Sequence, residues 1–178
     1  MLRKLLDRLY LAAGGLAALM VLAVAVLMVG QSVLREFHVA TGAVNDVVSW
    51  CCAAAAFLAM AHAFKHGDFV RVTLTMEHLS PAWQRRFELF SLCVGVAATG
   101  YLAWWATVFT WESWEFHEMG TGMLAWPLWI PQLSFVVGAW VFLIAVVDEA
   151  AIVLRGSVPT YVAAVEERHA RGDFSSDI

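Results

Sequence analysis

The sequence has few charged residues and few cysteines for its length. Only 15% of its 178 residues are Asp, Glu, Lys or Arg, and 61% are hydrophobic. Soluble domains carry about 25% charged residues, so this composition indicates a protein that sits in a membrane, and the length allows one compact bundle. The three cysteines lie inside apolar runs without a CxxC or zinc pattern, which excludes a disulfide framework. A formal charge of −4, with no basic stripe except in the gaps between apolar runs, argues against nucleic acid as a partner.

Four apolar runs are long enough to cross a bilayer. They cover residues 9–34, 47–64, 87–110 and 128–147, and a hydrocarbon core of ~30 Å takes about 20 residues as a helix. Lipid cannot satisfy free backbone N–H and C=O groups, and the runs are too long and uniform for barrel strands. The sequence therefore predicts an all-α integral membrane protein. It has one domain over residues 1–154 with four transmembrane helices, and a cytoplasmic tail over 155–178 that is partly disordered.

The positive charges separate by side of the membrane. The connection over residues 35–46 has Arg35 as its only Lys or Arg. The connection over 111–127 has no Lys or Arg and contains three glutamates. By the positive-inside rule, the other side is cytoplasmic, so both termini and the middle connection face the cytoplasm. The ten basic residues on that side are Arg3, Lys4, Arg8, Lys65, Arg71, Arg85, Arg86, Arg155, Arg168 and Arg171.

Tryptophans near the ends of the apolar runs support the same orientation. Amphipathic rings prefer the membrane interface, so these side chains are expected to anchor the helices there. Trp104, Trp105 and Trp140 fall within runs, where packing is the expected role. The anchors predicted for the outer face are Trp50, Trp111, Trp114, Trp126 and Trp129, and the one for the inner face is Trp83.

The segment between the second and third runs contains two breaks. Gly67 in "HGDF" is expected to end one helix in the left-handed conformation, and "SPAW" is expected to start the next with Ser80 as N-cap and Pro81 at the first helical position. Residues 68–79 between them fit both a strand alternation and a helical stripe. A lone strand would lack a pairing partner, so the sequence favours an interfacial amphipathic helix on the cytoplasmic side. Its neighbouring basic residues, expected at the lipid headgroups, are Lys65, Arg71, Arg85 and Arg86.

No residue pattern predicts a catalytic or metal site. His62 and His66 have i, i+4 spacing with Asp68 close by, but a structural zinc site needs four ligands, so polar residues at a headgroup boundary are the simpler interpretation. Acidic residues all fall at the ends of runs, whereas a transporter acting alone would carry one deep in the membrane. Asp46 is expected to be part of an N-cap of the second helix. We therefore expect no cofactor, no metal and no enzymatic activity.

The connection over residues 111–127 is acidic and flanked by tryptophans. In the simpler interpretation it is a solvated loop with the sign of charge expected on the outer side. In the other it is a docking edge for a soluble partner, through complementary charge. The residues concerned are Glu112, Glu115 and Glu118.

Two stretches resemble a known family. "FLAMAHAFKHGDFVRVTLTMEHLSPAWQRRFELF" and "GTGMLAWPLWIPQLSFVVGAWVFLI" are similar to the small permease subunit of TRAP transporters, the DctQ-type family. The chain departs from the family where an acidic pair is common, at Asn45 and Asp46, and at Thr73, where an acid is common. The resemblance implies a cation-driven importer of organic acids or similar solutes in the inner membrane of a bacterial cell. In such an importer, a periplasmic binding protein delivers the solute to a large permease subunit. The large subunit holds the solute and sodium sites and transports the solute, and the small subunit braces the large one.

A second hypothesis comes from another class of protein. A membrane-anchor subunit of a quinone- or haem-linked redox enzyme would also have about four spans. A haem cytochrome needs axial histidines within its bundle, and the first, third and fourth runs contain none.

Overall fold

The computed structural model describes residues 2–67, 80–157 and 159–171, and these residues form helices without a strand. The helices are α1 (Leu2–Glu36), α2 (Gly42–His66), α4 (Pro81–Glu115), α5 (Trp129–Leu154) and α6 (Thr160–Ala170). All except α6 are long and apolar enough to cross a membrane. The predicted all-α fold with four membrane spans is therefore confirmed. The interfacial helix predicted for residues 68–79 lies outside the described residues, as does the end of the tail over 172–178.

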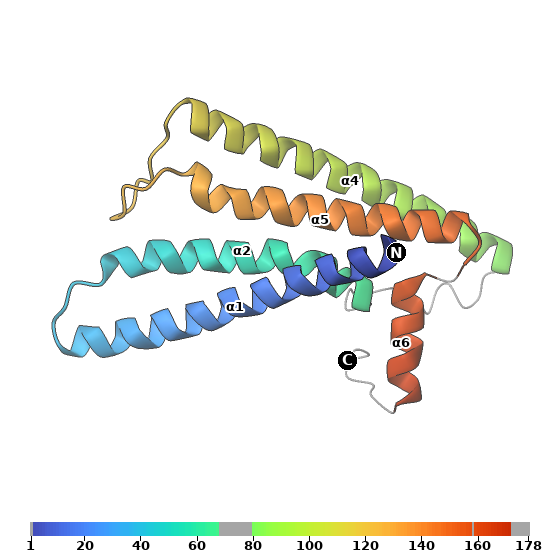
Figure 1. Cartoon of the computed structure of the whole chain (residues 1–178), viewed down its shortest axis with the longest axis horizontal. Helices are drawn as coiled ribbons and strands as arrows, with labels where there is room; N and C mark the ends of the chain where they lie inside the picture. The colour runs from blue at the N-terminus through green and yellow to red at the C-terminus, as the bar shows by residue number, and fades with distance from the viewer. Residues whose placement is uncertain (1, 68–79, 158, 172–178) are drawn as a thin grey trace.

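The four spans form an open row in the order α1, α2, α5, α4 (Figure 1). In its most apolar stretch, α5 has 44% of its residues buried, whereas the edge helix α1 has 11%. The row differs from the compact bundle that the length suggested. Its physical reason is that lipid tails are as apolar as the side chains, so no hydrophobic force closes the helices around a common core. The row leaves two free edges, α1 and α4.

The central contact of the row lies between α2 and α5, where small residues let the backbones approach. A Cβ atom on Gly138 of α5 would lie 2.6 Å from the backbone carbon of Phe57 in α2. Ala61 of α2 and Ala145 of α5 are buried in one cluster with Tyr10 of α1. Close approach of small residues is the usual way in which helices associate in lipid.

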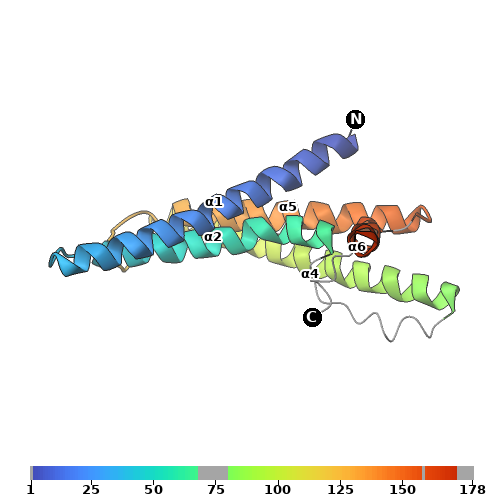
Figure 2. The same cartoon turned by 90° about the horizontal axis from the view of Figure 1, so that it is seen from below.

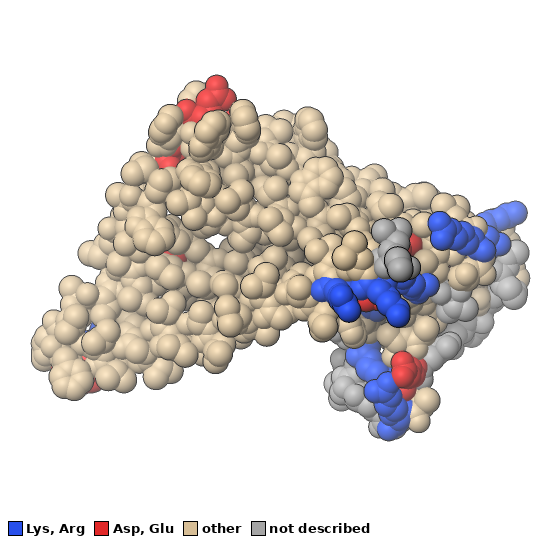
Figure 3. All heavy atoms as spheres, viewed as in Figure 1, with Lys and Arg blue, Asp and Glu red and all other residues tan. Residues whose placement is uncertain are grey.

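The two ends of the row differ in charge (Figure 3). We call the end at which α1 and α4 begin and α2 and α5 end the basic end, and the opposite end, with the connections over residues 37–41 and 116–128, the acidic end. At the basic end, Gly67 ends α2 with φ +75°, as predicted, and α6 runs across the row, so that Figure 2 shows it end-on. The helix α6 was not predicted from the sequence.

Two helix starts test the capping predictions. Helix α4 begins at Pro81 after Ser80, as predicted, although the Ser80 side chain makes no capping hydrogen bond. Helix α2 begins at Gly42, after Thr41. The expected N-cap at Asp46 is therefore wrong, because the helix starts one turn earlier and Asp46 lies within it.

Candidate functional site

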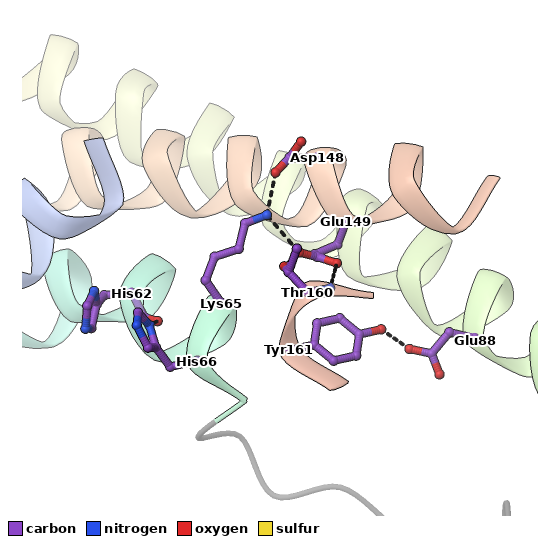
Figure 4. A network of polar contacts seen from close by, with 8 residues as sticks. All are labelled: His62, Lys65, His66, Glu88, Asp148, Glu149, Thr160 and Tyr161. Atoms are coloured by element: carbon purple, nitrogen blue, oxygen red, sulfur yellow. Dashed lines mark hydrogen bonds and ion pairs between the residues drawn. The ribbon is translucent and has the colours of Figure 1, made fainter. Parts of the chain in front are cut away.

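A polar network at the basic end connects α2, α5 and α6 (Figure 4). The ammonium of Lys65, on the last turn of α2, forms ion pairs with Asp148 and with Oε1 of Glu149 at 2.7 Å, both on α5. The side chain of Lys65 is 9% exposed and that of Glu149 is 0% exposed. Lys65 thus points into the protein and not to the surface, which the sequence did not predict.

Glu149 also holds the start of α6. Its Oε2 accepts a hydrogen bond from the backbone N–H of Thr160 at 3.0 Å, and its Oε1 accepts one from the Thr160 hydroxyl. The first N–H groups of a helix have no partner within the helix, and a carboxylate there also interacts favourably with the helix dipole. Glu149 therefore caps α6 and binds Lys65 with the same carboxylate.

The neighbouring residue of α6 extends the network to the other spans. Tyr161 is almost fully buried, and its hydroxyl donates a hydrogen bond to Glu88 of α4. Its ring packs 5.6 Å from that of Phe64 in α2. On the opposite side, the Lys65 ammonium lies 5.2 Å from the ring centre of Tyr10 in α1. All five described helices therefore contribute a side chain to this region.

Two arginines bind free carbonyl groups at helix ends nearby. Arg85 of α4 donates to the carbonyl oxygen of Leu154 at 3.3 Å, at the end of α5. Arg168 of α6 donates to the carbonyl oxygen of His66 at 2.6 Å, at the end of α2. The last carbonyls of a helix lack partners within it, and cations there are favourable. These basic side chains thus fasten helix ends as well as carrying charge on this surface.

Among the described residues, no side chains join the histidine pair in a group that could hold a metal ion. The rings of His62 and His66 lie 4.0 Å apart, and His66 Nδ1 lies 2.8 Å from the His62 carbonyl oxygen. Within residues 2–67, 80–157 and 159–171, no group of three or more His, Cys, Asp or Glu residues could hold a metal ion. Asp68, the third residue of the sequence pattern, is outside the described residues.

At the acidic end, the connection between α4 and α5 folds back onto α2. Asp46 of α2 accepts a hydrogen bond from the backbone N–H of Leu124 at 3.1 Å. Glu118 accepts one from the buried Ser113 hydroxyl at 2.8 Å. Glu112 and Glu115 are exposed on the last turn of α4. All three glutamates considered for docking are exposed, and Glu118 also holds the loop through its bond to Ser113.

The six candidate anchor tryptophans occupy both ends of the row. Trp50 and Trp126 lie with ring centres 6.0 Å apart, which joins the loop to α2. Trp111 and Trp114 lie 5.1 Å apart and are both exposed, and together with Trp129 they line a shallow apolar groove between α4 and α5. Trp83, at the basic end, has the Arg86 guanidinium 5.2 Å from its ring centre. Their contact with lipid stays a prediction.

One comparison with known proteins finds a family. A family model described as Tripartite ATP-independent periplasmic transporters, DctQ component, matches residues 24–156, about three quarters of the chain. No curated protein and no solved structure gives a match. The matched range runs from the middle of α1 through the end of α5 and so includes three spans in full.

The family decides between the two functional hypotheses. DctQ proteins work with a large permease subunit and a periplasmic binding protein, and they are transporter components and not enzymes. The match therefore favours the transporter subunit over the redox anchor. Together with four apolar helices, it indicates a multi-pass protein of the inner membrane. The chain belongs to the DctQ family and is the small subunit of a TRAP transporter.

Proposed function

We propose that this subunit braces the large permease subunit during cation-driven uptake of an organic acid or a similar solute. The proposal rests on one observation, namely that the buried charges are paired with one another inside the subunit. Lys65, Asp148 and Glu149 bind one another and the start of α6, so they join helices to each other. A buried charged group that is paired and hydrogen-bonded in this way positions its helices firmly. By resemblance to the family, we expect the solute and cation sites to lie on the large subunit.

The basic end faces the cytoplasm in this proposal. Figure 3 shows Lys and Arg side chains gathered there, as the positive-inside rule requires of the cytoplasmic side. Arg85 and Arg86 are exposed and would meet anionic headgroups, at about 1 kcal/mol for each basic residue near the surface. Arg71 belongs to the same proposal but lies outside the described residues. Lys65 is not part of it, because its charge is paired inside the protein.

Uptake by the reconstituted transporter tests the bracing role. We expect proteoliposomes with the large subunit and this chain to take up solute from the loaded binding protein when a sodium or proton gradient is imposed. Without this chain, uptake should fall to the level of empty vesicles, because the large subunit loses its support. Solute binding by the binding protein should not change. Undiminished, gradient-driven uptake by the large subunit alone would contradict the proposal.

Substitution of the exposed glutamates on the last turn of α4 tests whether the binding protein docks at the acidic end. Charges at the rim of an interface act mainly on the association rate and its salt dependence. We expect Glu112→Gln with Glu115→Gln to raise the concentration of binding protein needed for half-maximal uptake several-fold at low salt, and less so at high salt. Glu36→Gln, at the end of α1, is the matched control. An equal effect of both changes would show that the acidic loop is not the docking edge.

A further inference from the structure

One edge of the helix row is rich in aromatic residues. Helix α4 lies at this edge and packs along α5 (Figure 1). Its buried residues fall on one stripe, which contacts α5 and includes Leu92, Thr99, Ala103, Thr110 and Ser113. The opposite stripe is exposed and follows the same helical spacing, with Trp83, Phe87, Phe90, Val94, Tyr101, Trp104 and Trp105.

The other edge has a different chemistry. The large exposed side chains along the middle of α1 are aliphatic apart from Met28, namely Leu16, Leu19, Val21, Leu22, Val26, Val29 and Val33. Such side chains have no polar atom and are fully compatible with lipid tails. The surface of α1 therefore needs only lipid as a neighbour.

The aromatic edge carries polar atoms deep in the membrane. At 1.5 Å per residue, Tyr101 and Trp105 lie roughly 4 and 10 Å from the midpoint of α4, inside a hydrocarbon half-thickness of about 15 Å. Tyr101 is 68% exposed and Trp104 is 63% exposed. Within the described part of the chain, the Tyr101 hydroxyl and the indole N–H groups of Trp104 and Trp105 have no hydrogen-bond acceptor.

A tryptophan on the neighbouring helix shows how this protein satisfies such a group internally. The indole N–H of Trp140 on α5 donates a hydrogen bond to the Thr107 hydroxyl on α4 at 3.1 Å. Lipid tails offer no acceptor, and a polar group left without a partner in hydrocarbon is costly. The three exposed donors at this depth would therefore gain acceptors from a neighbouring protein.

We infer that the exposed face of α4 is the surface that binds the large permease subunit. The partner element would be a transmembrane helix that presents hydroxyl, amide or free carbonyl oxygens at the depth of Tyr101, Trp104 and Trp105. This inference rests on the proposed function and names the contact through which the brace acts. A second copy of this chain is a different occupant, which the experiment separates.

A triple variant, Tyr101→Phe, Trp104→Phe and Trp105→Phe, removes the donors and keeps an aromatic ring at each position, although the two Trp changes also reduce the size of the side chain. Each hydrogen bond between transmembrane helices contributes modestly, so we expect the loss of three to weaken association with the large subunit in detergent on the order of tenfold. The control is the α1 variant Leu19→Ala, Leu22→Ala and Val26→Ala, which should associate like the wild type. Thermal unfolding of the isolated variants checks that both still fold.

Photo-crosslinking identifies the neighbour directly. A photoreactive amino acid in place of Val94 should crosslink to the large subunit in membranes, and the same residue in place of Leu22 should not. A crosslink from position 94 to a second copy of this chain, or one to the large subunit from position 22 alone, would overturn the inference. Wild-type association of the folded triple variant would also overturn it. If the wild-type chain itself does not bind the large subunit, the bracing function fails, which is a separate result.

Discussion

Lys65→Met is expected to lower the free energy of unfolding of the isolated subunit by about 3–5 kcal/mol. The Met side chain has a similar length but leaves the carboxylates of Asp148 and Glu149 without their cation, and Glu149 is fully buried. A buried charge without its partner is much more costly than a charge lost at a surface. Equilibrium unfolding in mixed micelles with increasing SDS measures this difference.

A second variant separates the charge from the packing. Adding Asp148→Asn and Glu149→Gln to Lys65→Met removes all three charges. The Gln oxygen can still accept the hydrogen bond from the backbone N–H of Thr160. We expect this combination to recover most of the lost stability, because no uncompensated charge remains.

Tyr161→Phe removes one hydrogen bond to Glu88 and should have a smaller effect, about 1.5–3 kcal/mol for a bond to a charged group. Lys65→Met within 1 kcal/mol of the wild type would mean that the network contributes little.

Gly138→Leu is expected to separate α2 from α5. The first atom of the new side chain would lie 2.6 to 2.7 Å from backbone atoms of Phe57, and a helix backbone cannot give way as a flexible side chain can. Extra atoms in a tight contact cost about 1–3 kcal/mol, and occasionally more. We expect a loss of about 3 kcal/mol in the same unfolding assay, because all the added atoms enter the central contact of the row.

Gly15→Leu is the matched control for this substitution. Gly15 is also in the middle of a span, on α1, and a Cβ atom there meets nothing within 4 Å. Surface substitutions away from special features usually change stability by less than 0.5 kcal/mol. Equal losses for the two variants would show that the cost comes from replacing a helical glycine as such, and not from the α2–α5 contact.

Hydropathy predicted the membrane spans because lipid permits few alternatives. A run of about 20 apolar residues has to form a helix where no water satisfies its backbone. The order of the helices was not predictable in this way, because it depends on which small residues of α2 and α5 face each other. Helix α6 was missed because its apolar residues form only a short stripe, and its first turn depends on Glu149, which is 11 residues away from Thr160.

The candidate site was predicted less well than the fold. The positive-inside rule counts basic residues by side of the membrane, so it placed Lys65 correctly at the basic end but said nothing of its direction. A usable signal was present, because Asp148 and Glu149 end the fourth apolar run at the same end of the protein. Asp46 was assigned to a cap because the apolar run begins after it, whereas the helix starts at Gly42.

The open row has a mechanical consequence. The pair α1–α2 and the pair α4–α5 meet along one seam, between α2 and α5, and a row one helix thick would bend most easily there. Both ends of this seam are crossed by other segments. At the basic end, α6 is bound to α2 through Arg168 and to α5 through Glu149. At the acidic end, the 116–128 loop is bound to α2 through Asp46 and Trp50. The seam is clamped at both ends, so we expect the four spans to move as one stiff plate, in which a force on one edge reaches the other.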